Sequence, residues 1–130
     1  MSEMNIEQAR FNMIEQQIRP WDVLDPRVLD VLARVPREAF GPKQYHSLAF
    51  CDARIPLGHG QQMMVPAVEG RMLQALNIVP SDRILEIGTG SGFVTACLAD
   101  LGASVTSIEL IDELKFEAVE NLRSQGDGRV

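Results

Sequence analysis

Three glycines at alternate positions, spaced as GxGxG over residues 88–92, form the segment whose composition and spacing best suit ligand binding. The largely apolar residues Ile84–Ile87 before them are typical of a short buried strand, and the residues after them predict a helix. A glycine turn between a strand and a helix presents backbone amides at the carboxyl end of a sheet, where open α/β folds bind nucleotides. The pattern therefore predicts a ligand site formed by Gly88, Thr89, Gly90, Ser91 and Gly92.

Two acids flank this turn and narrow the choice of ligand. Glu86 lies two residues before Gly88, and Glu109 follows the next predicted strand, 21 residues after Gly88, where a carboxylate can accept both hydrogens of a ribose diol. The spacing is not the GxGxxG of pyrophosphate-binding dinucleotide folds, because Phe93 stands where the third glycine is needed. The combination favours an adenosyl ligand carrying an amino acid, which describes S-adenosylmethionine. An ordinary tight turn with a solvated Glu109 and a nicotinamide or flavin dinucleotide site remain as alternatives.

The composition limits the class of protein and of partner. The chain has 130 residues, of which 45% are hydrophobic and 23% charged, as is typical of one globular domain. Its formal charge of −6 argues against a nucleic-acid partner, because binding phosphates requires clustered Lys and Arg. No apolar stretch approaches the roughly 18 residues that cross a membrane, and residues 1–8 lack a secretion signal, so we expect no membrane partner and a cytoplasmic location. Neither Cys51 nor Cys97 has the spacing of a disulfide framework or a zinc site, so no metal site is expected.

Two helices are predicted near the N-terminus. The first, Asn5–Arg19, carries an apolar stripe and is ended by Pro20. The second begins with Asp25 as N-cap before a proline and extends to Val35, ahead of another proline.

An irregular stretch separates these helices from a third. Residues 37–57 contain helix-breaking glycine and proline residues, which predict a short helical turn and extended loop. The glycines at 58 and 60 then lead into residues 61–65, a charge-free loop that can pass close to a ligand. The third helix begins at Pro66 and closes near Asn77, and apolar residues repeat along it at Val68, Met72, Leu73 and Leu76.

Strand, helix, strand and helix alternate from residue 83 onward. After the first strand, a helix contains Cys97 as a core residue, and Ser104–Ile108 is the second strand. Asp112 caps the last helix, and residues 126–128 form a loop. The inward residues of this last helix are expected to be Leu114, Ala118, Val119 and Leu122. The alternation predicts an α/β, Rossmann-like fold with parallel strands joined by right-handed crossovers.

We therefore expect two segments within one domain. Residues 1–80 form an N-terminal helical and substrate-side loop segment, and residues 81–130 form the first half of the S-adenosylmethionine-binding Rossmann-like domain. A third strand should begin at Arg129–Val130, so the sheet is expected to be incomplete and the sequence looks truncated. Two strands leave an unpaired edge and an uncovered apolar face, which predicts a homo-oligomer or an exchange of elements between chains.

The wider sequence resembles the protein-L-isoaspartate O-methyltransferase family in five ordered blocks. They cover nearly the whole chain and are residues 13–19 (MIEQQIR), Asp25 with 27–29 (RVL), 35–40 (VPREAF), Asp52 with 55–61 (IPLGHGQ) and 85–92 (LEIGTGSG). The resemblance implies methyl transfer from S-adenosylmethionine to the free carboxylate of an isoaspartyl residue in a damaged protein or peptide. It further implies that Glu86 and the turn at 88–92 hold the methionyl part, that Glu109 holds the ribose, and that residues 58–64 line the substrate entrance.

One block departs from the family. After GxGQ the family usually has Thr-Ile-Ser, whose hydroxyl is thought to contact the substrate carboxylate, but this chain has Gln62, Met63 and Met64. A thioether cannot donate a hydrogen bond, so either Gln62 or a backbone amide replaces the hydroxyl, or the substrate differs. Core packing of the two methionines is the alternative, and His59 is a further candidate for the substrate side. A cofactor-binding or interaction module without turnover is the competing class of function.

Overall fold

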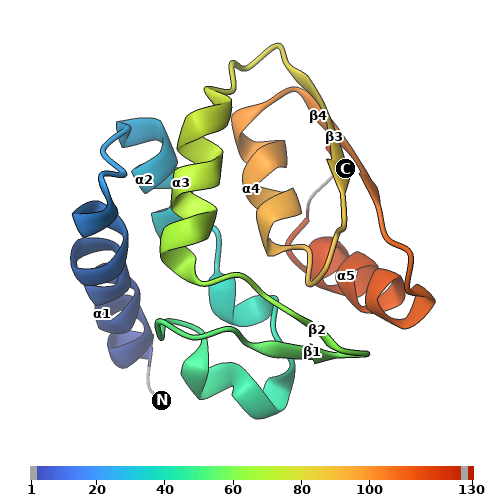
Figure 1. Ribbon diagram of the computed structural model, residues 1–130, viewed down its shortest axis with the longest axis horizontal. Coiled ribbons are helices and arrows are strands. Elements are labelled where there is room, and N and C mark those ends of the chain that lie inside the picture. The colour runs from blue at the N-terminus through green and yellow to red at the C-terminus, as the bar shows by residue number, and fades with distance from the viewer. Residues whose placement is uncertain (1–2, 127–128) are drawn as a thin grey trace.

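The computed structural model describes residues 3–126 and 129–130, and its first half is helical (Figure 1). Helix α1 (Glu3–Met13) continues into a π-helical turn, Ile14–Ile18, and a 3-10 turn, Arg19–Trp21. The predicted first helix is thus confirmed, with its last residues wound differently because Pro20 cannot donate a backbone hydrogen bond. Met13, Ile14 and Ile18 of its apolar stripe are buried.

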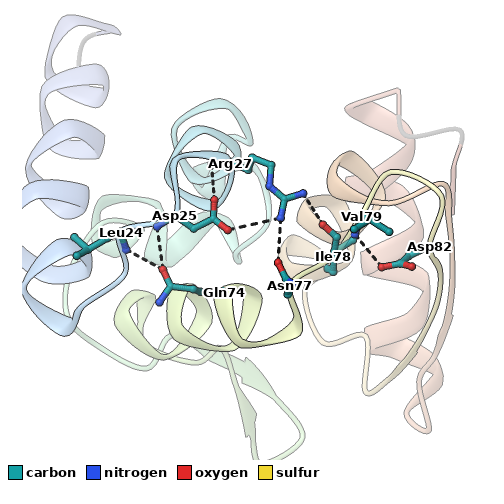
Figure 2. A network of polar contacts seen from close by, with 8 residues as sticks. All are labelled: Leu24, Asp25, Arg27, Gln74, Asn77, Ile78, Val79 and Asp82. Atoms are coloured by element: carbon teal, nitrogen blue, oxygen red, sulfur yellow. Dashed lines mark hydrogen bonds and ion pairs between the residues drawn. The ribbon is translucent and has the colours of Figure 1, made fainter.

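Helix α2 (Pro26–Arg34) begins as predicted, with the Asp25 carboxylate accepting from the backbone N–H of Arg27 at 2.9 Å. Figure 2 shows how polar contacts join this start to the end of α3 (Pro66–Leu76). The side-chain oxygen of Gln74 accepts from the backbone N–H groups of Leu24 and Asp25, at 2.8 and 3.0 Å. Arg27 donates to the carbonyl of Ile78 at 2.6 Å. These contacts fix the start of α2 against the end of α3.

The irregular stretch after α2 contains the 3-10 turns Arg37–Ala39 and Lys43–Leu48, as expected. A small antiparallel hairpin follows, formed by β1 (Pro56–Gly58) and β2 (Gln61–Gln62). Its tip is the segment 58–60, where φ is 87° at Gly58, 56° at His59 and 73° at Gly60. The predicted charge-free loop 61–65 therefore starts as a strand.

The second half has the predicted alternation and parallel pairing. β3 (Arg83–Ile87) leads to α4 (Phe93–Leu101), and β4 (Ser104–Ile108) leads to α5 (Asp112–Ser124). The strands pair in register from Arg83 opposite Ser104 to Ile87 opposite Ile108, which aligns their carboxyl ends. The carbonyl of Arg129, where a third strand is predicted to begin, accepts from the backbone N–H of Val105 at 2.8 Å. Residues 127–128 of the predicted final loop lie outside the described residues.

One hydrophobic core joins the two halves of the chain, with α3 lying between the N-terminal helices and α4 (Figure 1). Phe40 and Phe93 meet edge to face within it, with ring centroids 5.9 Å apart. Cys97 is fully buried, as expected of a core residue. Within the described part of the chain, no helix is both long and apolar enough to traverse a bilayer.

The apolar residues that repeat along α3 form only part of its buried face. Leu73 is buried, whereas Val68, Met72 and Leu76 are exposed, and the helix turns Ala67, Glu69 and Gly70 inward. Three expectations further along the chain are wrong. β3 is covered on one face only, so that Leu85 is 62% and Ile87 74% exposed. In α5, Val119 is exposed, and Asp112 is the first helical residue instead of the cap, which is Ile111.

Candidate functional site

A cavity of about 90 Å³ lies beside the glycine turn, at the carboxyl end of β3. It brings together predicted site residues from both halves of the chain: Gln62, Met64, Glu86, Gly88, Thr89, Gly90 and Ser91. Its remaining lining residues are Leu57, Met63, Glu69 and Val94. A cavity of this size accommodates a small group, such as a carboxylate or a methyl on sulfur, and not a whole nucleotide.

The turn has the backbone conformation that its glycines predict. Gly88, Gly90 and Gly92 have φ of 94°, 58° and 92°, a region that other residues rarely adopt. The N–H groups of Gly88 and Thr89 both donate to the carbonyl of Ile108, at 2.7 and 3.2 Å, so the turn is fixed to the end of β4. A Cβ on Gly88 would meet open space, whereas one on Gly92 would touch α5, 3.4 Å from Cγ of Leu122. Gly88 therefore leaves bare backbone at the cavity, and Gly92 permits close helix packing.

Glu86 is held in the cavity wall by hydroxyl groups. Its Oε1 accepts from the Ser107 hydroxyl at 2.6 Å and from the Thr95 hydroxyl, and the hydroxyls of Ser107 and Thr89 are 2.6 Å apart. Burial raises the pKa of Glu86; the hydroxyls oppose that shift, and the charge of Glu109 adds to it. A cation bound at this carboxylate would stabilise its ionised form.

Glu109 binds the backbone of the turn. Its two carboxylate oxygens accept from the backbone N–H groups of Gly90, at 2.8 Å, and Ile111, at 3.1 Å. These contacts fix the turn to the end of β4 and the start of α5. A carboxylate has about four lone-pair sites, so these two bonds leave capacity for ribose hydroxyls.

A buried ion pair, in which Glu69 lines the cavity, was not predicted. Nε of Arg37 lies 3.1 Å from Oε1 of Glu69, and the two side chains are 1% and 2% exposed. Arg37 also donates to the carbonyl of Met64 at 2.9 Å and to that of Ala49, and its guanidinium lies over the Phe93 ring, 5.5 Å from the centroid. Burial raises the pKa of Glu69 to about 7 although Arg37 acts to lower it. An acid in the first turn of a helix usually indicates solvent exposure and favourable helix-dipole interaction, so the sequence carries no signal for this pair.

The other predicted residues do not line the cavity. His59 is exposed at the hairpin tip, Gly92 packs against α5, and Glu109 lies behind the turn. The two methionines have different environments: Met63 is buried and Met64 is 37% exposed. In the residues described, no three His, Cys, Asp or Glu side chains gather as metal ligands would.

A wider cleft of about 700 Å³ also borders the turn. It shares Leu57, Gly90 and Ser91 with the smaller cavity and runs between the 3-10 turn Lys43–Leu48 and α5. Tyr45, Phe116, Glu117 and Glu120 line it. Gly90 and Ser91 of the turn thus border both the small cavity and the wider cleft.

Comparison with known proteins identifies relatives of this chain. It is 44% identical over 122 residues to the protein-L-isoaspartate O-methyltransferase of Aeropyrum pernix, covering 92% of this chain and 47% of the relative. It is 43% identical over 124 residues to protein-L-isoaspartate O-methyltransferase 2 of an Anaeromyxobacter species, covering 95% and 51%. The chain therefore spans about half the length of these curated relatives.

Solved structures show the same fold. A Plasmodium falciparum protein described as a beta-aspartate methyltransferase, in complex with S-adenosyl-L-homocysteine, superposes with a TM-score of 0.74 at 20% identity, over 95% of this chain and 56% of that one. The fold is accordingly the Rossmann-like α/β fold of these methyltransferases, with a helical segment before the sheet. The family model described as Protein-L-isoaspartate(D-aspartate) O-methyltransferase matches residues 8–130. The chain belongs to the protein-L-isoaspartate O-methyltransferase family.

Proposed function

We propose that this chain takes part in methyl transfer from S-adenosylmethionine to the carboxylate of an isoaspartyl residue in a damaged protein or peptide. The observation that carries the proposal is the half-buried carboxylate of Glu86 at a cavity bordered by the bare backbone of Gly88. The family membership and the names of the relatives support the same reaction.

The charge of the site suits this methyl donor. S-adenosylmethionine carries two cationic groups, a sulfonium and an ammonium, and one carboxylate. Glu86 would accept from the ammonium, and Glu109 from the ribose, while backbone at 88–90 approaches the methionyl chain. A dinucleotide would instead place an anionic pyrophosphate near these acids, which costs free energy. The fit therefore favours the methyl donor over the nicotinamide and flavin alternatives.

The chain needs no general base for this reaction. S-adenosylmethionine supplies an electrophilic methyl group, and attack by a carboxylate oxygen forms the methyl ester as the carbon–sulfur bond breaks. An ordinary carboxylate is already ionised at neutral pH, so the residues have to align it and exclude water. Leu57, Met63 and Val94 provide an apolar lining for that purpose.

We further propose a division of roles between the two segments. Residues 81–130 would provide the donor side through Glu86, Glu109 and the turn. Residues 1–80 would provide the acceptor side through the hairpin and the start of α3, which contribute Gln62, Met64 and Glu69 to the cavity.

Two measurements test this function. Calorimetric titration with S-adenosylmethionine should show binding to the wild-type chain and much weaker binding to Glu86→Gln, whereas a nicotinamide dinucleotide should give no heat. Transfer of labelled methyl to a peptide containing isoaspartate, with the same peptide containing aspartate as control, tests the acceptor. Donor binding without transfer to either peptide would support a binding module in place of an enzyme.

A different carboxylate acceptor is the second candidate. The side chains of Gln62 and Met64 stand at the cavity where the family pattern has Thr and Ser, so the acceptor side of this chain is chemically distinct. Labelled-methyl transfer to free small carboxylic acids, compared with transfer to the isoaspartyl peptide, distinguishes the two.

A further inference from the structure

Glu69 places a second carboxyl group at the cavity, on the proposed acceptor side. It comes from the first turn of α3 and lines the cavity together with Gln62 and Met64. Among the cavity-lining residues that the structure describes, only Glu69 and Glu86 carry ionisable side chains. An acceptor carboxylate bound there would therefore lie close to two acids. The donor's ammonium would compensate Glu86, whereas the charge of Arg37 is already neutralised by ionised Glu69, so the acceptor's charge has no cation left on that side unless Glu69 is protonated.

Two other elements bring charged groups near Glu69. Arg37, of the 3-10 turn Arg37–Ala39, forms the ion pair at 3.1 Å. Glu86 of β3 borders the same cavity. On α3 itself the next charged residue, Arg71, points elsewhere and donates to the carbonyl of Trp21 at 3.1 Å. Arg37 is thus the one cation that the described residues place against Glu69.

Arg37 is not free to meet an incoming anion. Its three guanidinium nitrogens donate to Glu69, to the carbonyl of Ala49 and to the carbonyl of Met64. The side chain is almost fully buried, so turning it toward the cavity would break several of these bonds at once. The group on this wall that can change its charge is Glu69, because burial raises its pKa to about 7.

We propose that Glu69 binds the acceptor carboxylate as a protonated carboxyl, donating its own O–H, so that the acceptor enters the site together with one proton. This proposal rests on the proposed methyl transfer to a carboxylate. A carboxylic acid beside a carboxylate forms a strong charge-assisted hydrogen bond, and the second negative charge keeps the proton in place. The proton comes from solvent and returns to it when the neutral ester leaves.

Binding measurements test the proposal without requiring turnover. An isoaspartyl peptide with blocked termini and without histidine is titrated into the chain saturated with S-adenosyl-L-homocysteine, between about pH 7 and about pH 9. Wild-type affinity should fall about tenfold per pH unit above the pKa of Glu69. Near the upper end of this range, calorimetry in two buffers of different ionisation enthalpy should show uptake of about one proton per peptide.

Glu69→Gln is the matched variant, because its amide N–H donates without titrating. Its peptide affinity should be independent of pH in this range, and no proton uptake should accompany binding. Glu113→Gln, an exposed acid on α5, should behave as wild type. The proton count on wild type needs no variant, so the test remains decisive if Glu69→Gln does not fold.

Two results would overturn the proposal: peptide binding without proton uptake, or the same pH dependence in wild type and Glu69→Gln. Failure of the peptide to bind a chain that does bind S-adenosyl-L-homocysteine would overturn it as well. If S-adenosyl-L-homocysteine itself does not bind, the proposed function fails, and the two failures are therefore distinguishable.

Discussion

Glu86 and Ser107 occupy opposite positions on the two parallel strands, and the Ser107 hydroxyl donates to Oε1 of Glu86 at 2.6 Å. The same oxygen accepts from Thr95 of α4, so a strand and a helix together fix the carboxylate. Glu86 is thereby held in one orientation at the cavity. The sequence predicts that Glu86 lies on a strand, but it does not say which face of the sheet the side chain occupies.

Removing this support should weaken binding of the methyl donor. Ser107→Ala removes a hydrogen bond to a charged group, which is worth about 1.5–3 kcal/mol, so we expect Kd for S-adenosylmethionine to rise about tenfold or more. The loss should grow as the pH is lowered, because Ser107 opposes the raised pKa of Glu86. Isothermal titration at several pH values measures both effects. Ser104→Ala, an exposed serine on the same strand, is the control, and equal losses in the two variants would contradict the assignment.

Alanine substitutions at Gly88 and Gly92 should distinguish effects on folding stability from effects on donor binding. Gly88 and Gly92 have nearly equal φ, 94° and 92°, so alanine carries a similar conformational cost of about 1–2 kcal/mol at each. A Cβ at Gly92 would lie in ordinary van der Waals contact with Leu122 and Ala118, whereas at Gly88 it meets open space. Thermal unfolding should therefore show similar losses of stability for Gly92→Ala and Gly88→Ala. Gly88→Ala should lose more donor affinity than Gly92→Ala, and equal donor affinities in the two variants would show that Gly88 does not border the ligand.

Local signals were enough to predict the strand, the glycine turn and the helix that follows it. Gly88, Gly90 and Glu86 lie within a few residues of one another, and their pattern fixes the turn without tertiary information. Parallel pairing then brings Glu109 to the same end of the sheet, as expected. The contacts of Ser107 and Thr95 with Glu86 depend on strand register and helix rotation, which no local pattern specifies.

The buried pair of Arg37 and Glu69 could not be predicted in the same way. Arg37 and Glu69 are 32 residues apart, and their burial follows from how α3 rotates against the N-terminal helices. The apolar residues of α3 suggested the opposite rotation. Gly70 decides the outcome, because a Cβ there would come within 3.1 Å of Ile18 and 3.3 Å of Val23, so the glycine permits a close approach that a larger side chain would prevent.

The uncovered face of β3 and β4 predicts self-association of this chain. Leu85, Ile87 and Ile108 lie on one face of the sheet and are 62%, 74% and 51% exposed. Sedimentation equilibrium should show a mass that rises with concentration, and Leu85→Lys should reduce that rise. Leu24→Lys, at a leucine equally exposed on the N-terminal side, is the control. A wild-type chain that is monomeric at every concentration would contradict the prediction.

Glu69 should also make folding stability depend on pH. The pKa of its carboxyl is about 7 in the folded chain and near the ordinary 4.5 when unfolded, so between these values the folded state binds more protons. Its contribution to the free energy of unfolding is thus fully present below about pH 4.5, falls as the pH rises toward 7 and is constant above that. The total loss is on the order of 3 kcal/mol.

Other acids add their own pH dependence, so the informative quantity is the difference between wild type and Glu69→Gln. Glutamine has no proton to lose, and its side-chain oxygen can still accept from Nε of Arg37. Relative to wild type, the variant should therefore gain stability as the pH rises from about 5 to about 8, as measured by urea unfolding at each pH. A difference that stays constant over this range would show that Glu69 is already ionised in the folded chain at pH 5, and that Arg37 outweighs the cost of its burial.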